Sequence, residues 1–322
     1  MPWDGNTELT PEERLISSTM GEWYEAKHRK QSDDEISLIN SIVPESCPRC
    51  CGMRFVRYGR YRNGCIKYKC LECGSAFNPL TNTIFDSHRI PISEWVEFLI
   101  HLFEFHSIRT SSRDNRNASS TGKYWLTKVF EVIKGFQDGI VLSGEIVFDE
   151  TYFSVVHSER TVRNGKLLRG ISRDKICIAV ATDGTNTVIV PETTSKPSRK
   201  STLEAMECHI KHGSTLIHDD EHSHSALVSS LGLKEIRIPS SSLKLMDDSE
   251  NPLTPVNDIH SLIKKFMRNH EGFSREDIAD WMNLISFIIN EPQNRFDKVE
   301  KFMKMALSTQ KRLKYRDVMS KK

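Results

Sequence analysis

The residues best suited to chemistry in the first quarter of the chain are four cysteines in two pairs. Cys47 and Cys50 form the first pair, and Cys70 and Cys73 form the second after nineteen intervening residues. Two residues between partners place both thiolates at one tight turn, and the intervening segment is long enough for a hairpin that brings the two turns together. This spacing is typical of a zinc ribbon with one tetrahedral ion. We therefore predict one structural Zn²⁺ ion bound by these cysteines.

Basic and aromatic side chains alternate between the two cysteine pairs. The basic residues that we expect to contact DNA are Arg54, Arg57, Arg60, Arg62 and Lys67. A zinc-bound hairpin covered in arginine and tyrosine suits contacts with the phosphates and grooves of nucleic acid. The alternative is a purely structural ribbon whose basic face is only solvated. Cys51, next to the first pair, is a second and less favoured candidate for the position of Cys50.

Two aspartates follow short apolar runs farther along the chain. Asp149 ends the run at 145–149, and Asp219 follows the run at 214–218. Side chains at strand ends in α/β sheets converge on a rigid edge, where sites are assembled. Two carboxylates at neighbouring strand ends repel each other unless a divalent cation lies between them, and Mg²⁺ prefers such oxygen ligands. We predict a divalent-cation site here, although a single aspartate at a strand end is more often a turn or cap residue.

A polar stripe on a predicted helix at 256–267 adds further candidates. Its members are Asn257, His260, Ser261 and Lys264. They occur at i, i+3, i+4 and i+7, so they lie on one helical face. Polar groups on a buried face are costly without a purpose. The alternative is an ordinary solvated face.

Several histidines near the second aspartate suggest a second zinc site as an alternative use of this region. They are His209, His212, His218, His222 and His224. Their spacings match no closed zinc site. We therefore expect exposed histidines in turns.

The elements that must position the acidic residues begin after Gly144. Short β-branched and aromatic runs predict strands at 145–149, 175–182, 187–190 and 214–218, with a helix at 201–212 before the last strand. Further helices are predicted at 256–267 and 275–290. Strands mixed with helices in this way indicate an α/β sheet domain.

The region before Gly144 is expected to be helical on both sides of the ribbon. Its patterns predict one or two helices within 8–42 and amphipathic helices at 91–105 and 121–136, separated by a polar stretch at 109–120. Two helices joined by a polar turn after a zinc ribbon would form a helix-turn-helix. A helical spacer that packs its own small core is an equally good alternative.

The overall charge of the chain does not by itself indicate a nucleic-acid partner. The chain has 322 residues, which suits about two domains, and a formal net charge of +2. Positive charge is instead concentrated in the ribbon and in the tail at 301–322, and local basic patches bind phosphates. We expect the tail either to follow DNA or to form a solvated terminal helix.

Cysteine usage and apolar runs bear on the cellular compartment. Four of the eight cysteines have metal-ligand spacing and the others follow no disulfide framework, so a reducing cytoplasm is expected. The N-terminus lacks the charged leader and apolar core of a secretion signal. No apolar run approaches the length of a membrane span, so we expect no membrane partner.

Four segments together resemble one protein family in their order and spacing. They are Gly144 to Tyr152, Leu168 to Lys175, Leu216 to Asp219 and Pro255 to Lys265. With the ribbon ahead of them, they resemble bacterial insertion-sequence transposases of the ISXO-like group, over about residues 40–320. The resemblance implies an α/β fold in which an RNase H-like catalytic domain, a mixed central sheet flanked by helices, follows a small zinc ribbon and a helical segment.

The resemblance also implies five regions along the chain. These are an N-terminal helical segment at 1–43, the zinc ribbon at 44–82, a helical DNA-binding segment, with or without a helix-turn-helix, at 83–140, the catalytic domain at 141–295 and a basic tail at 296–322. The ribbon would bind or orient DNA ends, and the chemistry would take place downstream.

The family implies a catalytic, metal-binding triad followed by a basic residue. Carried over, the triad falls on Asp149, Asp219 and Asn257, and the basic residue is Lys264. The third member is Glu in many relatives and Asn in some, and an amide oxygen is a weaker Mg²⁺ ligand than a carboxylate.

The second triad position has two acidic candidates in this chain. Many relatives have Asp-Gly there, whereas this chain has Asp219 followed by Asp220. We favour Asp219 because it directly follows the apolar strand. Glu150, adjacent to the first aspartate, is expected to point to the other side of its strand and to have a supporting role.

The implied function is that of a DNA transposase acting by a two-metal mechanism. Two Mg²⁺ or Mn²⁺ ions about 4 Å apart would support strand cleavage and then strand transfer. The implied partners are double-stranded DNA, as element terminal repeats and as target, and further copies of the chain in the active complex. The implied location is the bacterial cytoplasm, with the nucleoid when bound to DNA.

Two other functions fit parts of the pattern. The first is a catalytically inactive zinc-ribbon DNA-binding protein or regulator derived from a transposase, suggested by the neutral Asn257. Against it, Asp149, Asp219 and Lys264 all remain at their motif positions. The second is an RNase H-like nuclease that cuts DNA without joining it.

Overall fold

The computed structural model describes residues 10–11, 15, 32–86, 90–155, 160–168, 170–243, 246–247, 249–270 and 276–319. Most of the predicted N-terminal helical segment lies outside these residues. So do Arg169, the first residue of the predicted helix at 275–290 and the end of the basic tail. Among the described residues, no helix combines the length and apolarity needed to cross a bilayer.

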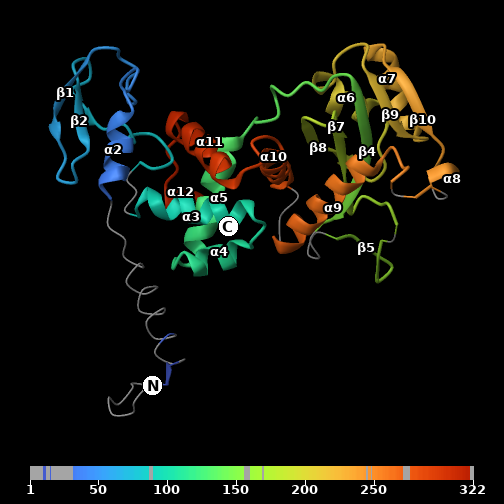
Figure 1. The fold of residues 1–322 in the computed structure, drawn as a ribbon, viewed down its shortest axis with the longest axis horizontal. Helices are drawn as coiled ribbons and strands as arrows, with labels where there is room; N and C mark the ends of the chain where they lie inside the picture. Colours follow the sequence, from blue (N-terminus) through green and yellow to red (C-terminus); the bar gives the residue numbers. More distant parts are fainter. Residues whose placement is uncertain are drawn as a thin grey trace. The chain divides into compact units, whose positions relative to one another are not determined.

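The chain folds into two compact units. The first comprises Met1–His101, Arg109–Lys123 and Leu307–Lys322, and the second comprises Leu102–Ile108 and Tyr124–Ala306. Figure 1 traces the chain through both units, coloured from blue at the N-terminus to red at the C-terminus.

A three-stranded antiparallel sheet forms the hairpin of the first unit (Figure 1). Its strands are β1 (Phe55–Arg60), β2 (Ile66–Cys70) and β3 (Ala76–Phe77), in the order β1-β2-β3. Tyr68 stacks on Phe77 with 5.5 Å between ring centroids, and Phe55 meets both rings edge-on. A core of this size rarely supplies enough free energy to hold a fold without a further staple.

The Asn40 side chain of helix α2 (Asp33–Ser41) bonds to this hairpin. The Asn40 amide oxygen accepts a hydrogen bond from the Ile66 N–H at 2.7 Å, and its amide nitrogen donates to the Gly64 carbonyl at 3.2 Å. Ser32 caps the start of α2 by accepting from the Glu35 N–H at 3.1 Å. Because both partners of Asn40 lie at the hairpin turn, α2 and the turn are held as one piece.

The helices that follow the hairpin are α3 (Ile92–Phe103), α4 (Ile108–Asp114) and α5 (Ser119–Ile133). The polar stretch at 109–120, predicted to be a turn, therefore contains a helix. Ser111 is fully buried, and Asn115 donates to the Glu94 carbonyl of α3 at 2.8 Å. These small polar residues pack against α3 and satisfy its backbone, so their polarity alone wrongly suggested a solvated turn.

The second unit contains a five-stranded mixed sheet in the order β10-β9-β4-β7-β8 (Figure 1). The strands are β4 (Glu145–Ser154), β7 (Lys175–Thr182), β8 (Thr187–Thr194), β9 (Thr215–Asp219) and β10 (Lys234–Ile238). β7 is antiparallel to β4 and β8, whereas β9 is parallel to β4 and β10. This sheet confirms the predicted mixed α/β architecture of a central sheet flanked by helices.

The remaining elements connect or cover this sheet and extend to the end of the described chain. They are β5 (Val162–Arg163), β6 (Lys166–Leu167), α6 (Arg199–Met206), η3 (Glu207–His209), η4 (His222–His224), α7 (Ser225–Leu231), α8 (Ser240–Leu243), α9 (Thr254–Asn269), α10 (Ile278–Ile289), α11 (Arg295–Ser308) and α12 (Tyr315–Met319). The sequence patterns did not anticipate α7 and β10.

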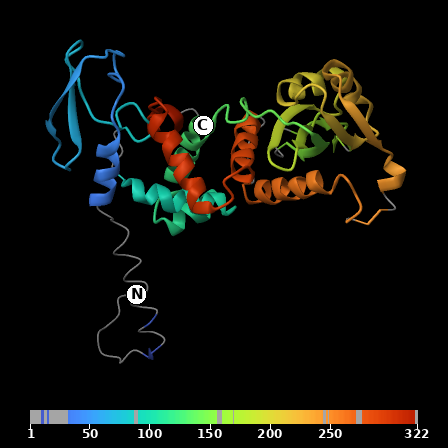
Figure 2. The same ribbon diagram turned by 45° about the horizontal axis from the view of Figure 1, so that its top comes forward.

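The two faces of the sheet are covered by different helices (Figures 1 and 2). Ile146 and Phe148 of β4 belong to a core with Met206 of α6 and Leu227 of α7. Successive strand residues alternate between faces, so Asp149 projects to the opposite face. There α9 packs against β4 and β7.

The first strand extends beyond its predicted end. β4 was expected to stop at Asp149, but it continues to Ser154 because it pairs with β7 over its whole second half. Its other neighbour, β9, is shorter, and their parallel pairing ends with Phe148 opposite His218. Asp149 therefore lies in the middle of β4, at the point where the parallel partner strand ends.

A buried lysine joins α11 to the end of α10. Lys298 Nζ donates to the carbonyls of Phe287, Ile288 and Asn290, at 3.3 Å for Phe287 and 2.7 Å for Asn290. Burial, assisted by the charge of Lys301, lowers the pKa of Lys298 to about 8.

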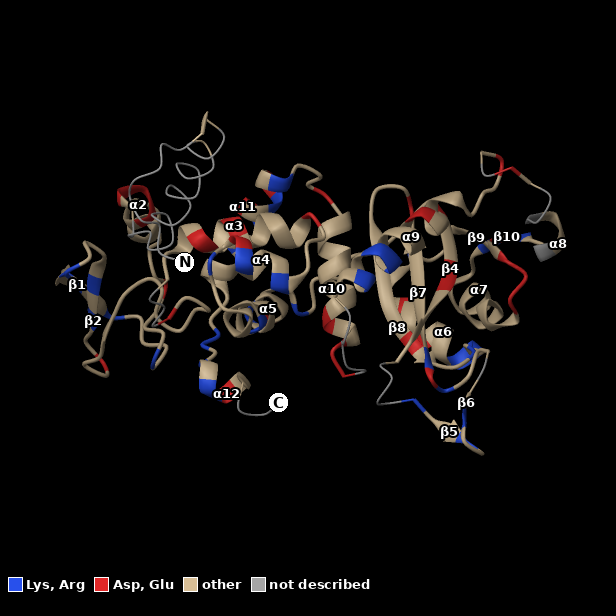
Figure 3. Cartoon of the chain, turned by 90° about the horizontal axis from the view of Figure 1, so that it is seen from below, with Lys and Arg blue, Asp and Glu red and all other residues tan. Residues whose placement is uncertain are grey.

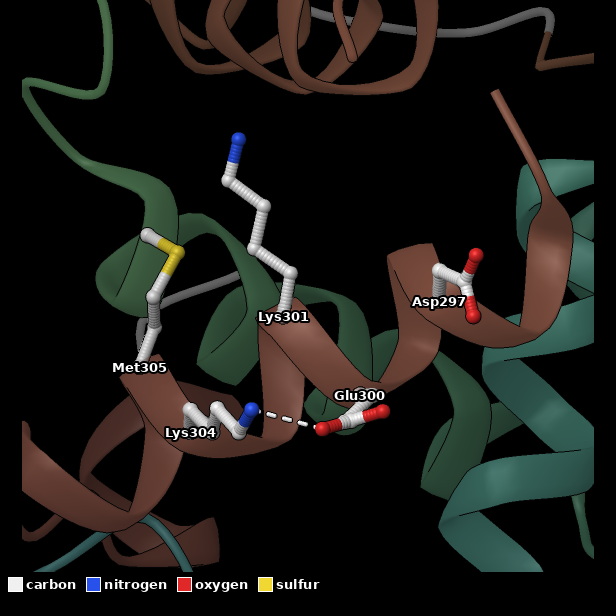
Figure 4. A pocket seen from close by; sticks show the side chains of 5 residues that line it. All are labelled: Asp297, Glu300, Lys301, Lys304 and Met305. Carbon is white, nitrogen blue, oxygen red and sulfur yellow. Dashed lines mark ion pairs between the residues drawn. The ribbon is translucent and has the colours of Figure 1, made fainter. Parts of the chain in front are cut away.

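The exposed side of α11 carries an open hollow of about 410 Å³ lined by Asp297, Glu300, Lys301, Lys304 and Met305 (Figure 4). None of these residues is a predicted site residue.

Candidate functional site

The four paired cysteines converge at one end of the hairpin. Cys47 Sγ lies 3.8 Å from Cys73 Sγ, and Cys50 Sγ lies 3.6 Å from Cys70 Sγ. Four thiolates at the Zn–S distance of about 2.3 Å in a tetrahedron are about 3.8 Å apart. The cluster therefore has the dimensions of a tetrahedral zinc site, while Cys51 is exposed and lies outside it.

Hydrogen bonds reach two sulfurs of this cluster and favour the thiolate of Cys73. The N–H groups of Glu72 and Cys73 donate to Cys70 Sγ at 3.4 and 3.5 Å. Hydrogen bonds from the side chain and backbone of Ser75 lower the pKa of Cys73 to about 6. A thiolate rather than a thiol is the form that binds metal.

The outer face of the hairpin combines aromatic and basic side chains. Val56 is opposite Lys69 in the β1–β2 register. Lys67 and Lys69 place their ammonium groups 5.3 and 5.1 Å from the ring centroid of Tyr58, and Lys67 is also 5.5 Å from that of Tyr61. The exposed arginines predicted to contact DNA are Arg54, Arg57, Arg60 and Arg62. Lys69 and the two tyrosines extend the predicted basic set, and Figure 3 shows blue segments along this hairpin.

The second cluster forms where β9 ends beside β4. Asp149 and Asp219 directly follow the paired residues Phe148 and His218, so they occupy adjacent positions on parallel strands. Burial, the charge of Glu150 and the charge of Asp219 together raise the pKa of Asp149 to about 7. Asp219 Oδ1 accepts from the Glu221 N–H at 3.1 Å. The two aspartates therefore repel each other, which is the electrostatic condition that a divalent cation relieves.

The alternative acid at the second position is engaged elsewhere. Asp220 is exposed and lies 3.3 Å from Arg237. Its side chain thus forms an ion pair on the surface of β10, whereas the charge of Asp219 acts on Asp149.

The spacing placed four polar residues of helix α9 on one face, but in the structure His260 is buried beside this cluster and the other three are exposed. His260 is buried, and its Nδ1 lies 4.0 Å from Asp149 Oδ2. Asn257, Ser261 and Lys264 are exposed. Burial, assisted by the positive charge of Lys264, lowers the pKa of His260 to about 4. The imidazole beside Asp149 is therefore neutral at physiological pH.

A signal for the inward position of His260 was present in the sequence. The buried apolar residues of α9 are Val256, Ile259, Ile263, Phe266 and Met267. Position 260 follows 256 by one turn and precedes 263 by three residues, so it belongs to this inward stripe. Asn257, three residues earlier, lies on its solvent-facing edge.

The opposite face of the sheet carries a chain of hydrogen bonds through two buried histidines. His224 Nε2 lies 2.8 Å from Glu150 Oε1, and His224 Nδ1 lies 2.8 Å from His218 Nδ1. His218 Nε2 lies 3.1 Å from Glu235 Oε1. These two histidines, expected to be exposed in turns, are completely buried because the strand β9 and the turn η4 direct them under α7. Glu150 lies on this face, away from Asp149, as predicted.

The contacts in this chain link the protonation of the two histidines. With both glutamates ionised, each histidine must donate from Nε2, and one of the two Nδ1 atoms must also carry a proton. Burial opposes charge on His224, but Glu150, Asp219 and Asp149 raise its pKa above the usual value. Burial and the charge of His224 lower the pKa of His218. His224 therefore holds a proton more readily than His218, and its Nδ1 lies 4.0 Å from Asp219 Oδ1.

Comparison with known proteins finds no sequence match and only distant structural similarity. No protein-family model matches the chain, and no curated protein matches its sequence. Similar solved structures include a simian T-cell lymphotropic virus intasome with the PP2A regulatory subunit B56 gamma, at 13% identity and a TM-score of 0.29, over 59% of this chain and 65% of that chain.

Two DNA transposition complexes are also similar. They are the Mos1 strand transfer complex, at 12% identity and a TM-score of 0.29 over 68% of this chain and 78% of that one, and the Drosophila P element transposase strand transfer complex, at 12% and 0.27 over 66% and 64%. This chain thus spans about two thirds of the intasome and P element chains. Similarity at these scores is too low to bear on fold or activity.

The raised pKa of Asp149 predicts that removing its charge stabilises the metal-free protein. The folded state retains the Asp149 proton up to about pH 7, whereas the unfolded state loses it near pH 3.8, so this group's contribution to stability falls as pH rises between these values. Asp149→Asn should raise the free energy of unfolding by about 1–3 kcal/mol at pH 8 and by much less at pH 4. Urea unfolding in chelator measures both values, with the exposed Asp258→Asn as the control. An equal effect at the two pH values would contradict the prediction.

The histidine chain predicts a strong coupling between Glu150 and His224. His224→Leu leaves the Glu150 carboxylate, with 5% of its side chain exposed, without its partner, and should cost about 3–5 kcal/mol. Adding Glu150→Leu should recover most of that loss, because no buried charge then remains. A double-mutant cycle by urea unfolding measures the coupling, and the exposed His222→Leu is the matched control. Additive losses in the two variants would show that the pair is not coupled.

Proposed function

We propose that this chain is a DNA transposase that binds element ends and catalyses metal-dependent strand cleavage and strand transfer. The main support is the adjacent placement of Asp149 and Asp219 on the parallel strands β4 and β9, within a mixed sheet flanked by helices. Their mutual repulsion and the raised pKa of Asp149 fit a site that binds a cation. The resemblance of the sequence motifs supplies the reaction class.

Asp149 and Asp219 are the residues that would hold divalent cations. Their oxygens are the hard ligands that Mg²⁺ and Mn²⁺ accept. When bound, two such ions would polarise a phosphodiester and make a water or a DNA 3′-hydroxyl more nucleophilic. Asn257 is the third ligand by family resemblance, and its exposed side chain lies one turn before His260 on α9.

The exposed edge of α9 is where a DNA backbone would approach the carboxylates. Lys264 is exposed one turn after His260, close enough for its charge to lower the pKa of that histidine. Its ammonium group would contact a phosphate beside the cleaved bond and offset negative charge that develops there. His224, when protonated, would hold Asp219 in place through its charge.

The cysteine cluster would bind one structural zinc ion, and the hairpin would orient DNA. Cluster dimensions support the zinc, and the Lys67, Lys69 and Tyr58 face supports contact with phosphates and sugars. The division into five regions, with the catalytic domain at 141–295, belongs to the same proposal. So do synapsis of two ends by several copies and a location in the bacterial cytoplasm and nucleoid.

One observation favours a second function, an inactive DNA-binding regulator derived from a transposase. The third family position lacks a carboxylate, because Asn257 is neutral and the residue that reaches Asp149 is a histidine. A regulator would bind the same DNA without cutting it. Cleavage with and without metal therefore separates the two functions.

Purified full-length protein should nick and join DNA that flanks its own gene, in the presence of Mg²⁺ or Mn²⁺. Asp149→Ala should lower both rates on the order of a thousandfold, because it removes a ligand of the ions that polarise the phosphate. DNA binding by gel shift should remain. Asp220→Ala, which breaks only a surface ion pair, should retain activity. Cleavage that survives Asp149→Ala refutes the site, and binding with no cleavage by the unaltered chain supports the regulator.

Zinc removal should disorganise the hairpin without unfolding the second unit. The unaltered chain is expected to retain one zinc ion through dialysis, because structural sites of this kind bind with about 10–16 kcal/mol. Cys70→Ser should lose the metal and expose the hairpin to proteolysis, whereas Cys51→Ser, outside the cluster, should retain it. Zinc content and limited proteolysis measure these outcomes. Retention of zinc by Cys70→Ser would contradict the assignment.

A further inference from the structure

Two buried imidazoles face each other through the same ring atom beside Asp219. His218 Nδ1 and His224 Nδ1 are 2.8 Å apart, and His224 Nδ1 is 4.0 Å from Asp219 Oδ1. One ligand atom from each of these three residues lies within 4.8 Å of the other two. The three side chains therefore converge on one point next to the end of β9.

Both rings are held by a carboxylate at their far nitrogen. His224 Nε2 lies 2.8 Å from Glu150 Oε1 on β4, and His218 Nε2 lies 3.1 Å from Glu235 Oε1 on β10. Histidines that bind metal almost always donate the other ring N–H to a carboxylate, a backbone carbonyl or water, and this contact fixes the ring and frees the facing nitrogen as a ligand. The two glutamates lie on the strands on either side of β9, so together they orient both Nδ1 atoms toward the same point.

Hydrogen bonding alone uses this arrangement poorly. When each Nε2 donates to its glutamate, both Nδ1 atoms are acceptors unless one of them carries a second proton. Two facing acceptors repel each other, and both rings are fully buried, where an added charge is costly. A divalent cation that accepts both lone pairs removes the repulsion, and the carboxylates of Glu150, Asp219 and Glu235 balance its charge.

The distances between these atoms suit a transition-metal ion after a small adjustment. Ligand atoms about 2.0–2.1 Å from a zinc ion in a tetrahedron are about 3.3 Å apart. The observed separations of 2.8 and 4.0 Å lie on either side of this value, so the two rings must separate and Asp219 must approach, each by less than about 1 Å. The Asp219 side chain is 29% exposed, so an ion reaches the site from solvent, and a water completes the tetrahedron.

We propose that His218, His224 and Asp219 form a binding site for Zn²⁺, in which Glu150 and Glu235 position the two imidazoles. Two nitrogen ligands and one carboxylate favour Zn²⁺ over Mg²⁺, which selects oxygen. The site goes beyond the proposed function, because it lies on the α7 side of the sheet and does not use Asp149. It also differs from the cysteine cluster in having no sulfur ligand.

Cobalt tests this site without interference from the cysteine cluster. Full-length protein that retains zinc at the cysteines should bind one Co²⁺ ion with the visible absorption of a tetrahedral site and without a thiolate charge-transfer band. X-ray absorption at the cobalt edge should show two imidazole ligands. Zn²⁺ should displace this Co²⁺, whereas Mg²⁺ at the same concentration should not.

Matched variants identify the ligands. His218→Gln and His224→Gln should each raise the Kd for Co²⁺ at least about tenfold, or about 1.4 kcal/mol, because each removes one ligand. Glu150→Gln should weaken binding about ten- to a hundredfold by loosening the ring of His224. His222→Gln, exposed in the same turn η4, is the control and should bind Co²⁺ as the unaltered protein does. Circular dichroism establishes that each variant is folded, and the cobalt-edge spectrum of the unaltered protein decides if one is not.

The results that would overturn this site differ from those that would overturn the proposed function. Absence of Co²⁺ binding outside the cysteine cluster, or bound Co²⁺ without imidazole ligands, excludes the site. Equal Kd values for the unaltered, His218→Gln and His224→Gln proteins assign the ion elsewhere. Asp149→Asn should retain the two-imidazole cobalt spectrum, so failure of the proposed strand cleavage leaves this site standing.

Discussion

Parallel pairing between β4 and β9 brings together two aspartates that are seventy residues apart in the chain, and the second unit is organised around the resulting repulsion. One aspartate alone at this depth would be tolerated in its neutral form. Burial and the neighbouring charges of Glu150 and Asp219 together raise the pKa of Asp149 to about 7. The groups around the two aspartates differ between the two faces of the sheet. The short length of β9 matters most, because its end leaves Asp149 without a neighbour strand on that side.

The two faces of the sheet handle charge differently. On the α7 face, Glu150, His224, His218 and Glu235 form a closed chain in which every ring nitrogen has a partner. His224 Nδ1 on this face lies 4.0 Å from Asp219 Oδ1. On the α9 face, His260 is neutral and carries no positive charge toward Asp149. The ring nitrogens on the α7 face therefore all have partners, whereas His260 Nε2 on the α9 face has none among the described residues.

The hairpin of the first unit depends on a different source of stability. Its aromatic core consists of a few rings on one face of three short strands, and its other face is basic and exposed. A four-cysteine cluster at one end and the Asn40 contact at the turn restrain the two ends of the same hairpin. The face with Tyr58, Lys67 and Lys69 lies opposite the aromatic core. This face is therefore suited to binding another molecule.

The sequence by itself determined features that depend on local spacing. Two CxxC pairs converge as predicted because a short hairpin permits little else. β7 has its predicted bounds because its apolar run, in which β-branched residues alternate with cysteine and alanine, has no competing pattern. Asp149 and Glu150 point to opposite faces because strand residues alternate.

Only the tertiary structure decided which neighbours those residues meet. β4 continues past Asp149 because β7 pairs with it. The stretch at 109–120 contains part of helix α4, and Asn115, which follows α4, donates to the Glu94 carbonyl of α3. His218 and His224 are buried on the face of the sheet that α7 covers. His260 faces Asp149 and Asn257 faces solvent because packing of α9 on the sheet fixes its rotation. Helical spacing alone does not set that rotation, which decides whether a polar side chain of α9 faces Asp149 or solvent.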